Sequence, residues 1–324
     1  MKKSFKLFLA AAVLVTEFFV VALPLMITSA KADGHPIQAI THAGFGGGTD
    51  VTTRMMLLRT RRYLKQDMQL VNKKGGGGAA SMDYMMTLPA DGQHTLTWTT
   101  GHAVSMALGK TKVKLSDMQP LARGTDDPQL FVVNCKNDIK DAKKFVSAQK
   151  SKSLKYGTTH VGGIDDVSAI AFTKKGKLTD PTIVPYKGVG PIKTNLIKGD
   201  IDVGVLNLGE AVTEIEDGTL CVSVVLASNR MEKLSNVPTA TELGIPVVLS
   251  TVRGFVTRKG VPAERKKQLE GAMIKAMEHK YFQSFLTDIG LDSTSVVGAD
   301  EWGKQMEVML AEMTAQLKAL GYIN

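Results

Sequence analysis

Residues 41–50 of the chain read THAGFGGGTD, with four glycines and two threonines between an apolar run and a helical pattern. Glycine lets another group come close to the backbone, and the first N–H groups of a helix have no partner inside that helix. Such a segment suits three kinds of site: a nucleotide phosphate cradle, the oxyanion hole of a hydrolase, or a binding site for a small anion.

Short β-rich runs alternate with longer helical patterns along the chain. We expect strands at 37–42, 68–72, 94–100, 129–134, 154–157, 182–186, 201–206 and 220–228, with extended chain again at 251–260. We expect helices at 49–64, 79–88, 138–149, from about 165, near 192 and near 211, and then at 263–278, 281–289 and 299–320. This order predicts an α/β fold with parallel-dominated sheets covered by helices.

A second strand, glycine-threonine loop and helix follow the same plan at 154–174, in the segment LKYGTTHVGGIDDVSAIAF. In a parallel α/β sheet, such loops lie at the carboxyl ends of the strands, where ligands bind. Two matched loops therefore favour an anion-binding site over the simpler interpretation, which is an ordinary tight turn between a strand and a helix.

The amino terminus has the layout of a secretory signal peptide. Lys2, Lys3 and Lys6 precede a long apolar run, and Ala30-Lys31-Ala32 offers a cleavage site. We therefore interpret residues 1–32 as a signal that exports the protein to the periplasm. An uncleaved membrane anchor is the alternative, because about 20 apolar residues can span a bilayer.

The formal net charge of the chain is +9, and its lysines are spread rather than concentrated in one stripe. A nucleic-acid binder usually shows a concentrated basic surface, so we expect no nucleic-acid partner. The two cysteines, Cys135 and Cys221, could form a disulfide in an oxidising compartment or remain as two buried thiols. The spacing of cysteines and histidines supports neither a metal site nor a thiol nucleophile.

The nucleotide and hydrolase interpretations lack their required motifs. No glycine pair is followed by the Lys-Ser/Thr of a phosphate-binding loop, and Thr49 stands where a dinucleotide motif needs its third glycine. The nucleophile elbow G-x-S-x-G of a hydrolase does not occur in the sequence. We therefore expect no enzyme activity and no cofactor, and the anion-binding interpretation remains.

Eight segments, in order, resemble the substrate-binding proteins of tripartite tricarboxylate transporters, also called the Bug family. The segments are GFGGGTDVTTR (44–54), ADGQHTL (90–96), LKYGTTHVGG (154–163), VPYKGVGP (184–191), IKGDIDVGV (197–205), EDGTLCVSVVLASNR (216–230), LSNVPTATELG (234–244) and GFVTRKGVPAE (254–264). The resemblance implies a type II periplasmic binding protein, in which two α/β lobes enclose an interdomain ligand cleft. It implies a first lobe of residues 33–128 plus 253–324, and a second lobe of residues 129–252.

The resemblance also implies which residues face the ligand. They belong to the two glycine loops and to neighbouring strand ends: Phe45, Gly46, Gly47, Gly48, Thr49, Asp50, Thr99, Thr100, His102, Thr158, Thr159, Gly162, Gly163, Asp166, Tyr186 and Asn207. Arg54 and Lys187 are potential counter-charges for an anion, although exposed positions on helix faces are the simpler interpretation of both.

The second loop departs from the family pattern at two positions. Gly163 replaces a Ser or Thr, and Asp166 replaces a His, with Asp165 beside it. Asp165 is expected to be the N-cap of the following helix, because Asp is favoured there. Alternatively, Asp166 accepts a hydrogen bond from the ligand, which would favour hydroxy or amino acids over plain di- and tricarboxylates.

These observations predict an exported, monomeric solute-binding protein. It would capture a small organic acid by hinge closure and deliver it to the membrane permease of a tripartite transporter. A periplasmic sensor that binds the same ligand and docks on a membrane signalling receptor is the alternative.

Overall fold

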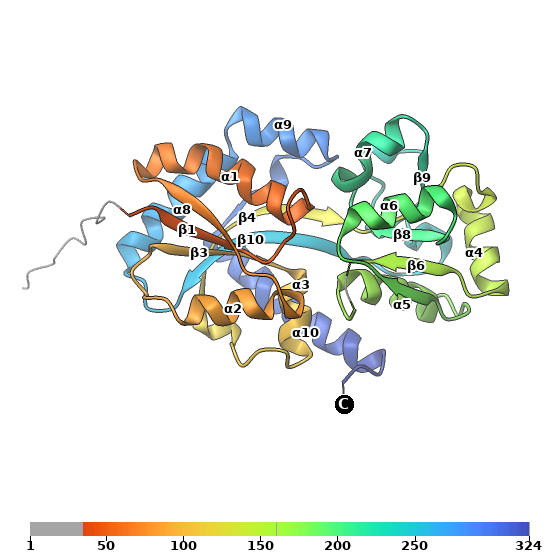
Figure 1. The fold of residues 1–324 in the computed structure, drawn as a ribbon, viewed down its shortest axis with the longest axis horizontal. Coiled ribbons are helices and arrows are strands. Elements are labelled where there is room, and N and C mark those ends of the chain that lie inside the picture. The colour runs from red at the N-terminus through yellow and green to blue at the C-terminus, as the bar shows by residue number, and fades with distance from the viewer. Residues whose placement is uncertain (1–34, 160, 324) are drawn as a thin grey trace, which may run out of the picture. The chain divides into compact units, whose positions relative to one another are not determined.

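The structure is a computed structural model, and it describes residues 35–159 and 161–323 (Figure 1). The predicted signal peptide, residues 1–32, lies outside the described residues. In the described part of the chain, no helix combines the length and the apolarity that crossing a membrane requires. Residues 34–324 belong to one contact unit, so the boundaries of the two lobes remain a prediction.

The strands form two sheets. The six-stranded sheet has the order β11–β4–β10–β3–β1–β2, built from β1 (Ile37–Thr41), β2 (Met68–Asn72), β3 (His94–Thr99), β4 (Met118–Pro128), β10 (Ser250–Arg258) and β11 (Val297–Gly298). The five-stranded sheet has the order β7–β6–β8–β5–β9, built from β5 (Leu130–Asn134), β6 (Lys155–Thr158), β7 (Thr182–Pro185), β8 (Val203–Leu206) and β9 (Leu220–Val225).

Both sheets are mixed, so the expectation of parallel-dominated sheets holds only for part of each. Strand β1 pairs in parallel with β2 and β3, and β6 pairs in parallel with β7 and β8. The pairs of β10 with β3 and β4, and of β5 with β8 and β9, are antiparallel. The parallel strands are joined by crossover helices, whereas the antiparallel strands are those through which the chain passes from one sheet to the other.

Ten α-helices cover the sheets in the described residues. Around the six-stranded sheet they are α1 (Gly48–Leu64), α2 (Ala79–Met86), α3 (Thr100–Ala107), α8 (Ala263–Met277), α9 (Lys280–Asp288) and α10 (Ala299–Ala319). Around the five-stranded sheet they are α4 (Ala142–Ser151), α5 (Ile164–Lys175), α6 (Val189–Lys198) and α7 (Leu208–Glu216). Short 3₁₀ turns are η1 (Gly76–Gly78), η2 (Leu115–Asp117), η3 (Asp138–Lys140), η4 (Glu232–Leu234), η5 (Thr241–Leu243) and η6 (Ser293–Ser295). The sequence patterns missed α3 and β4.

The chain crosses between the sheets at Gln129. Its N–H donates to Leu249 O at 2.9 Å, and its carbonyl accepts the N–H of Leu226 at 2.8 Å. The N–H of Leu249 donates in turn to Leu226 O, so three segments that enter or leave the crossing are bonded to one another. This backbone network joins the two passages of the chain between the sheets.

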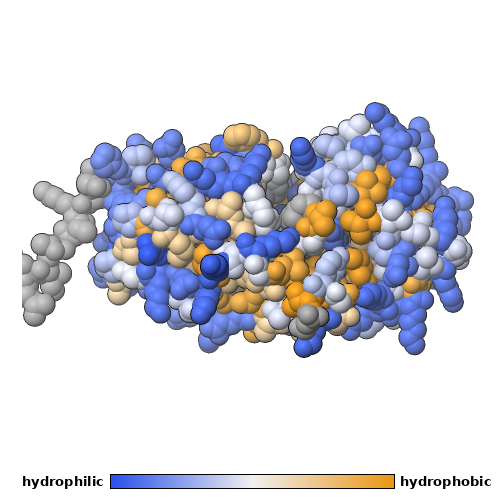
Figure 2. Space-filling view, turned by 60° about the horizontal axis from the view of Figure 1, so that its bottom comes forward, coloured by the Kyte–Doolittle hydropathy of each residue, from blue (hydrophilic) through white to orange (hydrophobic). Residues whose placement is uncertain are grey.

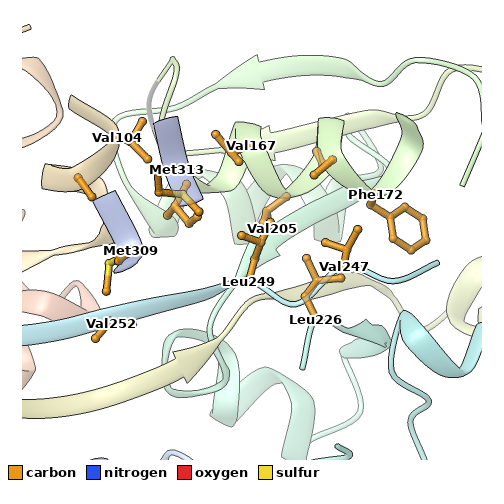
Figure 3. Close-up of a cluster of buried hydrophobic side chains, with 14 of the residues drawn as sticks. Val104, Val167, Phe172, Val205, Leu226, Val247, Leu249, Val252, Met309 and Met313 are labelled. Atoms are coloured by element: carbon orange, nitrogen blue, oxygen red, sulfur yellow. The ribbon is translucent and has the colours of Figure 1, made fainter. Parts of the chain in front are cut away.

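One hydrophobic cluster continues from one sheet to the other (Figure 3). Val104 of α3 and Met313 of α10 are buried in the same cluster as Val167 of α5 and Val205 of β8. Helix α10 packs against both α3 and α5. Full burial of each such side chain contributes roughly 1.5–3 kcal/mol to stability. This shared core therefore joins the two sheets where α10 packs against α3 and α5.

The molecular surface on this side is not uniformly polar. Figure 2 turns the lower side of Figure 1 forward and shows hydrophobic residues gathered near the middle of the face. Hydrophilic residues predominate toward its two ends.

Cys135 and Cys221 form a disulfide, with a Cα–Cα distance of 5.0 Å. Cys221 lies in β9 opposite Val133 of β5, and Cys135 follows β5 directly, so strand pairing brings the two cysteines together. Of the two alternatives left open by the sequence, the disulfide is therefore the one that the structure shows.

Candidate functional site

The first glycine loop joins β1 to α1, and its backbone requires glycine. Gly46 has φ +74°, in the left-handed region, and Gly47 is the extended N-cap residue of α1. The N–H of Gly46 donates to Asp50 Oδ2 at 3.1 Å, so a carboxylate of the helix's own first turn folds the loop back. Asn72, at the end of β2, also donates to Ala43 O and fixes the loop to the neighbouring strand.

The second glycine loop joins β6 to α5 with matching geometry. Gly162 has φ +67°, and Gly163 is the extended N-cap of α5. The N–H of Gly162 donates to Asp166 Oδ2 at 2.6 Å, as Gly46 donates to Asp50. The two loops therefore repeat one backbone design at the carboxyl ends of β1 and β6.

The prediction that Asp165 caps α5 is wrong. Gly163 holds the N-cap position, and Asp165 is the second residue inside the helix. Its Oδ2 accepts hydrogen bonds from Thr159 N at 2.9 Å and from Thr159 Oγ1 at 2.6 Å, so it supports the loop from within the first turn. The alternative role of Asp166, a bond to the ligand, stays a prediction, and its Oδ2 already accepts from Gly162.

A buried arginine that sequence reasoning missed lies at the start of α1. Arg253 of β10 is 2% exposed, and its Nε donates to Thr49 Oγ1 at 3.2 Å. Its Nη1 donates to Asp127 Oδ2 at 2.9 Å, and its Nη2 donates to Asn207 Oδ1 at 2.9 Å. The available signal was a charged residue inside the extended run 251–260, because a charge buried in a strand needs a partner.

Glu210, also missed, joins the start of α7 to the start of α1. Its Oε1 accepts the N–H of Gly48 at 3.4 Å, and its Oε2 accepts the N–H of Asn207 at 3.0 Å. Asn207 Nδ2 donates to Asp127 O and Pro128 O, both at 2.9 Å. The structure thus brings the predicted residues Gly48, Thr49 and Asn207 together around Arg253 and Glu210.

The carboxylates of this cluster have raised pKa values. Burial raises the pKa of Asp127 to about 7, although the Arg253 guanidinium opposes the shift. Burial also raises the pKa of Glu210, against Arg253 and the N–H groups of Asn207 and Gly48, while the charge of Asp165 adds to the rise. The electrostatics of this site are thus set by one cation, Arg253, that lies among the carboxylates of Asp127 and Glu210.

The residues that follow β3 are occupied by internal hydrogen bonds. Thr99 N–H donates to His102 Nδ1 at 3.0 Å, so the proton of the neutral ring lies on Nε2 and is donated to Ser81 Oγ at 3.0 Å. Burial and His42 lower the pKa of His102 well below its usual value. Thr100 Oγ1 donates to Ser250 O at 3.0 Å and accepts from Val252 N at 2.9 Å. These residues hold α3 in place.

The remaining predicted residues lie nearer to the two loops. Phe45 is 79% exposed at the tip of the first loop. Thr158 is fully buried, and within residues 35–159 and 161–323 its Oγ1 makes no hydrogen bond. The partly buried Tyr186 donates its N–H to Thr158 O at 2.8 Å, so it stands beside the second loop.

The two potential counter-charges have exposed positions. Arg54 Nε lies 2.9 Å from Asp50 Oδ2, with its side chain 48% exposed, and its guanidinium stands 5.6 Å from the Phe45 ring centre. Lys187 is exposed. Among the described residues, no three His, Cys, Asp or Glu side chains are grouped to hold a metal ion.

Comparisons with known proteins agree with this geometry. Residues 52–320 match the family model described as tripartite tricarboxylate transporter family receptor. The chain is 27% identical to the BugT protein of Bordetella pertussis over 220 residues, which is 65% of this chain and 66% of that protein. It is 25% identical over 248 residues to a protein of Agrobacterium vitis from a ttuE-ttuC' intergenic region, covering 75% of this chain and 71% of that protein.

Solved structures show the same fold. A TctC solute-binding protein from Polaromonas superposes with a TM-score of 0.72 at 24% identity, over 89% of this chain and all (100%) of that one. The MatC protein of Rhodopseudomonas palustris with bound malate has a TM-score of 0.78 at 23% identity, over 87% and 98% of the two chains. Another R. palustris protein, with adipate, has a TM-score of 0.81 at 21% identity, over 90% and 99%.

The fold is accordingly that of a type II periplasmic binding protein, as the sequence predicted. The family model covers most of the described chain, from within α1 to the end of α10, and includes all of α5. The chain belongs to the receptor family of the tripartite tricarboxylate transporters, whose members are periplasmic solute-binding proteins and not enzymes.

Proposed function

We propose that this protein captures a small organic carboxylate in the periplasm and delivers it to the membrane permease of a tripartite transporter. The observation that carries the proposal is the pair of matched glycine loops, the first of which starts its helix beside the buried Arg253. Helix N-termini attract anions through unpaired N–H groups and the helix dipole. The relatives solved with malate and adipate support the same ligand class.

In this proposal, the start of α1 binds one carboxylate of the ligand. Gly48 offers a backbone N–H, Thr49 offers a hydroxyl, and Arg253 supplies the charge. Thr158 and the start of α5 bind the far end of the ligand, beside Asp165 and Asp166. Removing water from such a site strengthens each charge-assisted hydrogen bond, which is the physical reason for enclosing the ligand.

Transport proceeds by rotation of the two predicted lobes about the crossing at Gln129. The closed form, with its ligand enclosed, is the form that the permease recognises, and the predicted signal peptide exports the chain to the compartment where this happens. The antiparallel strands β4 and β10 end at this crossing, which supports its role as the hinge.

The test is a thermal-shift screen of residues 33–324 against small organic acids, including malate, adipate and citrate. A ligand at about a hundredfold excess over its Kd stabilises the folded state by about 2.7 kcal/mol, a shift of several degrees. We expect Thr49→Ala and Thr158→Ala to reduce the shift, and Thr194→Ala, at an exposed threonine of α6, to preserve it. A flat response to every organic acid, with amines or nucleotides active instead, would contradict the proposal.

A further inference from the structure

Glu210 occupies the position that the proposed function gives to a ligand carboxylate. Its Oε2 stays on its own helix, where it completes a capping box with the N–H of Asn207 at 3.0 Å. Its Oε1 leaves that helix and accepts the N–H of Gly48, the first residue of α1, at 3.4 Å. A carboxylate of the chain therefore lies on the anion-attracting end of α1.

The space beside Gly48 is filled by the same cluster. A methyl group added to Gly48 would come within 2.5 Å of Arg253 Nη2 and 3.3 Å of Glu210 Oε1. The guanidinium and the carboxylate thus flank the bare backbone of Gly48 on the side where an anion would approach. A ligand carboxylate and the Glu210 carboxylate cannot both accept from the Gly48 N–H in this geometry, because one N–H offers one strong hydrogen bond.

Glu210 is held at this position by opposing forces. Arg253 of β10 attracts it, whereas Asp165 of α5 and Asp127 of β4 carry charge of its own sign. Burial also disfavours its ionised form. Its contact with Gly48 is long for a hydrogen bond to a carboxylate, which ordinarily measures about 2.7–2.9 Å. A carboxylate bound in this way can be replaced by one with better geometry.

We propose that Glu210 is a built-in competitor, which covers the N-terminus of α1 in the absence of ligand and must leave it before a ligand carboxylate binds there. This inference rests on the proposed function, because it assumes that the ligand carries a carboxylate. While Glu210 accepts the Gly48 N–H, this hydrogen bond connects α7 to α1. Ligand binding breaks that connection. The resting protein thus keeps its own anion on a helix end that would otherwise accept any small anion.

Two variants and one control test the competition by isothermal titration with malate, adipate and citrate. Glu210→Ala removes the competing carboxylate, and Glu210→Gln removes its charge while preserving the capping box, so folding is maintained. Glu214→Gln is the control, because Glu214 lies one turn further along α7 and pairs with Lys193 at 2.6 Å. We expect Glu210→Ala to lower the Kd for a bound acid by about tenfold, which corresponds to 1.4 kcal/mol, and the control to leave it unchanged.

The outcomes separate the inference from the proposed function. Equal or weaker binding by both Glu210 variants overturns the competition and leaves the proposed function standing. Binding of no organic acid by wild type or variants overturns the proposed function, and the competition with it.

Amide hydrogen exchange at Gly48 gives a second readout that requires no ligand. We expect faster exchange in Glu210→Ala than in wild type, and recovery of protection when the bound acid is added. Exchange at Gly48 that is the same in Glu210→Ala and wild type overturns the inference, whichever acids bind.

Discussion

The two glycine loops share one backbone and differ in charge. In each loop, a left-handed glycine donates its N–H to the carboxylate of the residue four positions later, and an extended glycine caps the helix. At the first loop the helix start faces the Arg253 guanidinium. At the second, Asp165 stands at the position that Thr49 has in α1, and it accepts hydrogen bonds from Thr159. The two loops thus have the same backbone, and their charge differs because a distant arginine lies at the first and two acidic residues of its own helix lie at the second.

This asymmetry gives the proposed ligand an orientation. If the proposed function holds, we expect a carboxylate at the first loop and a hydroxyl or amine at the second, where Asp165 and Asp166 lie in the first turn of α5. We therefore expect the departures of the second loop from the family pattern to affect one end of the ligand only.

The largest expected effect is that of removing the cation. Arg253→Leu leaves Asp127 as a buried carboxylate without its partner, and breaking a buried pair in this way costs about 3–5 kcal/mol. We expect this loss in the free energy of unfolding measured with urea. Arg230→Leu is the matched control: its pair with Glu242 is exposed, so the change should stay within about 1 kcal/mol. Similar losses of unfolding free energy for both variants would show that the buried pair of Arg253 stabilises the fold no more than an exposed pair does.

The pH dependence of stability tests the same cluster. The pKa of Asp127 rises from 3.8 to about 7 on folding, so the folded state binds more protons than the unfolded chain between these values. Its contribution is full below pH 3.8 and is lost as the pH rises through about 7, by at most about 4 kcal/mol. We expect the unfolding free energy to fall less between about pH 5 and about pH 8 in Asp127→Asn than in wild type.

The difference between wild type and Asp127→Asn is the quantity to read in that experiment. Burial lowers the pKa of His102, so its contribution has the opposite sign and is lost as the pH falls through its folded value. This contribution is common to both proteins and cancels. Parallel pH profiles would show that Asp127 keeps an ordinary pKa beside Arg253.

The backbone likeness of the loops predicts equal and smaller effects. Gly46→Ala and Gly162→Ala each force a Cβ into the left-handed region, at a cost of about 1–2 kcal/mol. Gly271→Ala, inside α8 where an added Cβ meets no atom within 4 Å, should instead stabilise by about 0.5–1 kcal/mol. Urea unfolding of the three variants measures this. A much larger cost at one loop than at the other would break the likeness.

The smallest effect on stability and ligand affinity is expected for Arg54, which the sequence suggested as a potential counter-charge for an anion. Its side chain is half exposed, and its pair with the buried Asp50 carboxylate joins residues four apart in α1, a contact worth about 0.2–0.5 kcal/mol. Arg54→Ala should therefore change the unfolding free energy by no more than about 0.5 kcal/mol, and the Kd for an organic acid by no more than about twofold. A tenfold loss of affinity would assign the cation role of the first loop to Arg54.

Local patterns predicted the glycine loops because their residues lie next to one another in the chain. Gly46 and Gly162 do adopt the conformations that favour glycine, and each loop does start a helix. The misplaced cap shows the limit of this reasoning: Asp165 is a favoured N-cap residue, but Gly163 already ends the loop two positions earlier. His102 stays a predicted pocket residue, and both of its ring nitrogens are already hydrogen-bonded, to Thr99 and Ser81.

The sequence by itself determined the alternation of strands and helices, the two matched helix starts and the family, because each depends on patterns of neighbouring residues. Only the tertiary structure decided which distant side chains contact the start of α1. Arg253 meets Thr49 across 204 positions, and Glu210 meets Gly48 across 162. Such contacts depend on how β4, β10 and α7 pack at the crossing between the sheets, and no local backbone preference encodes that packing.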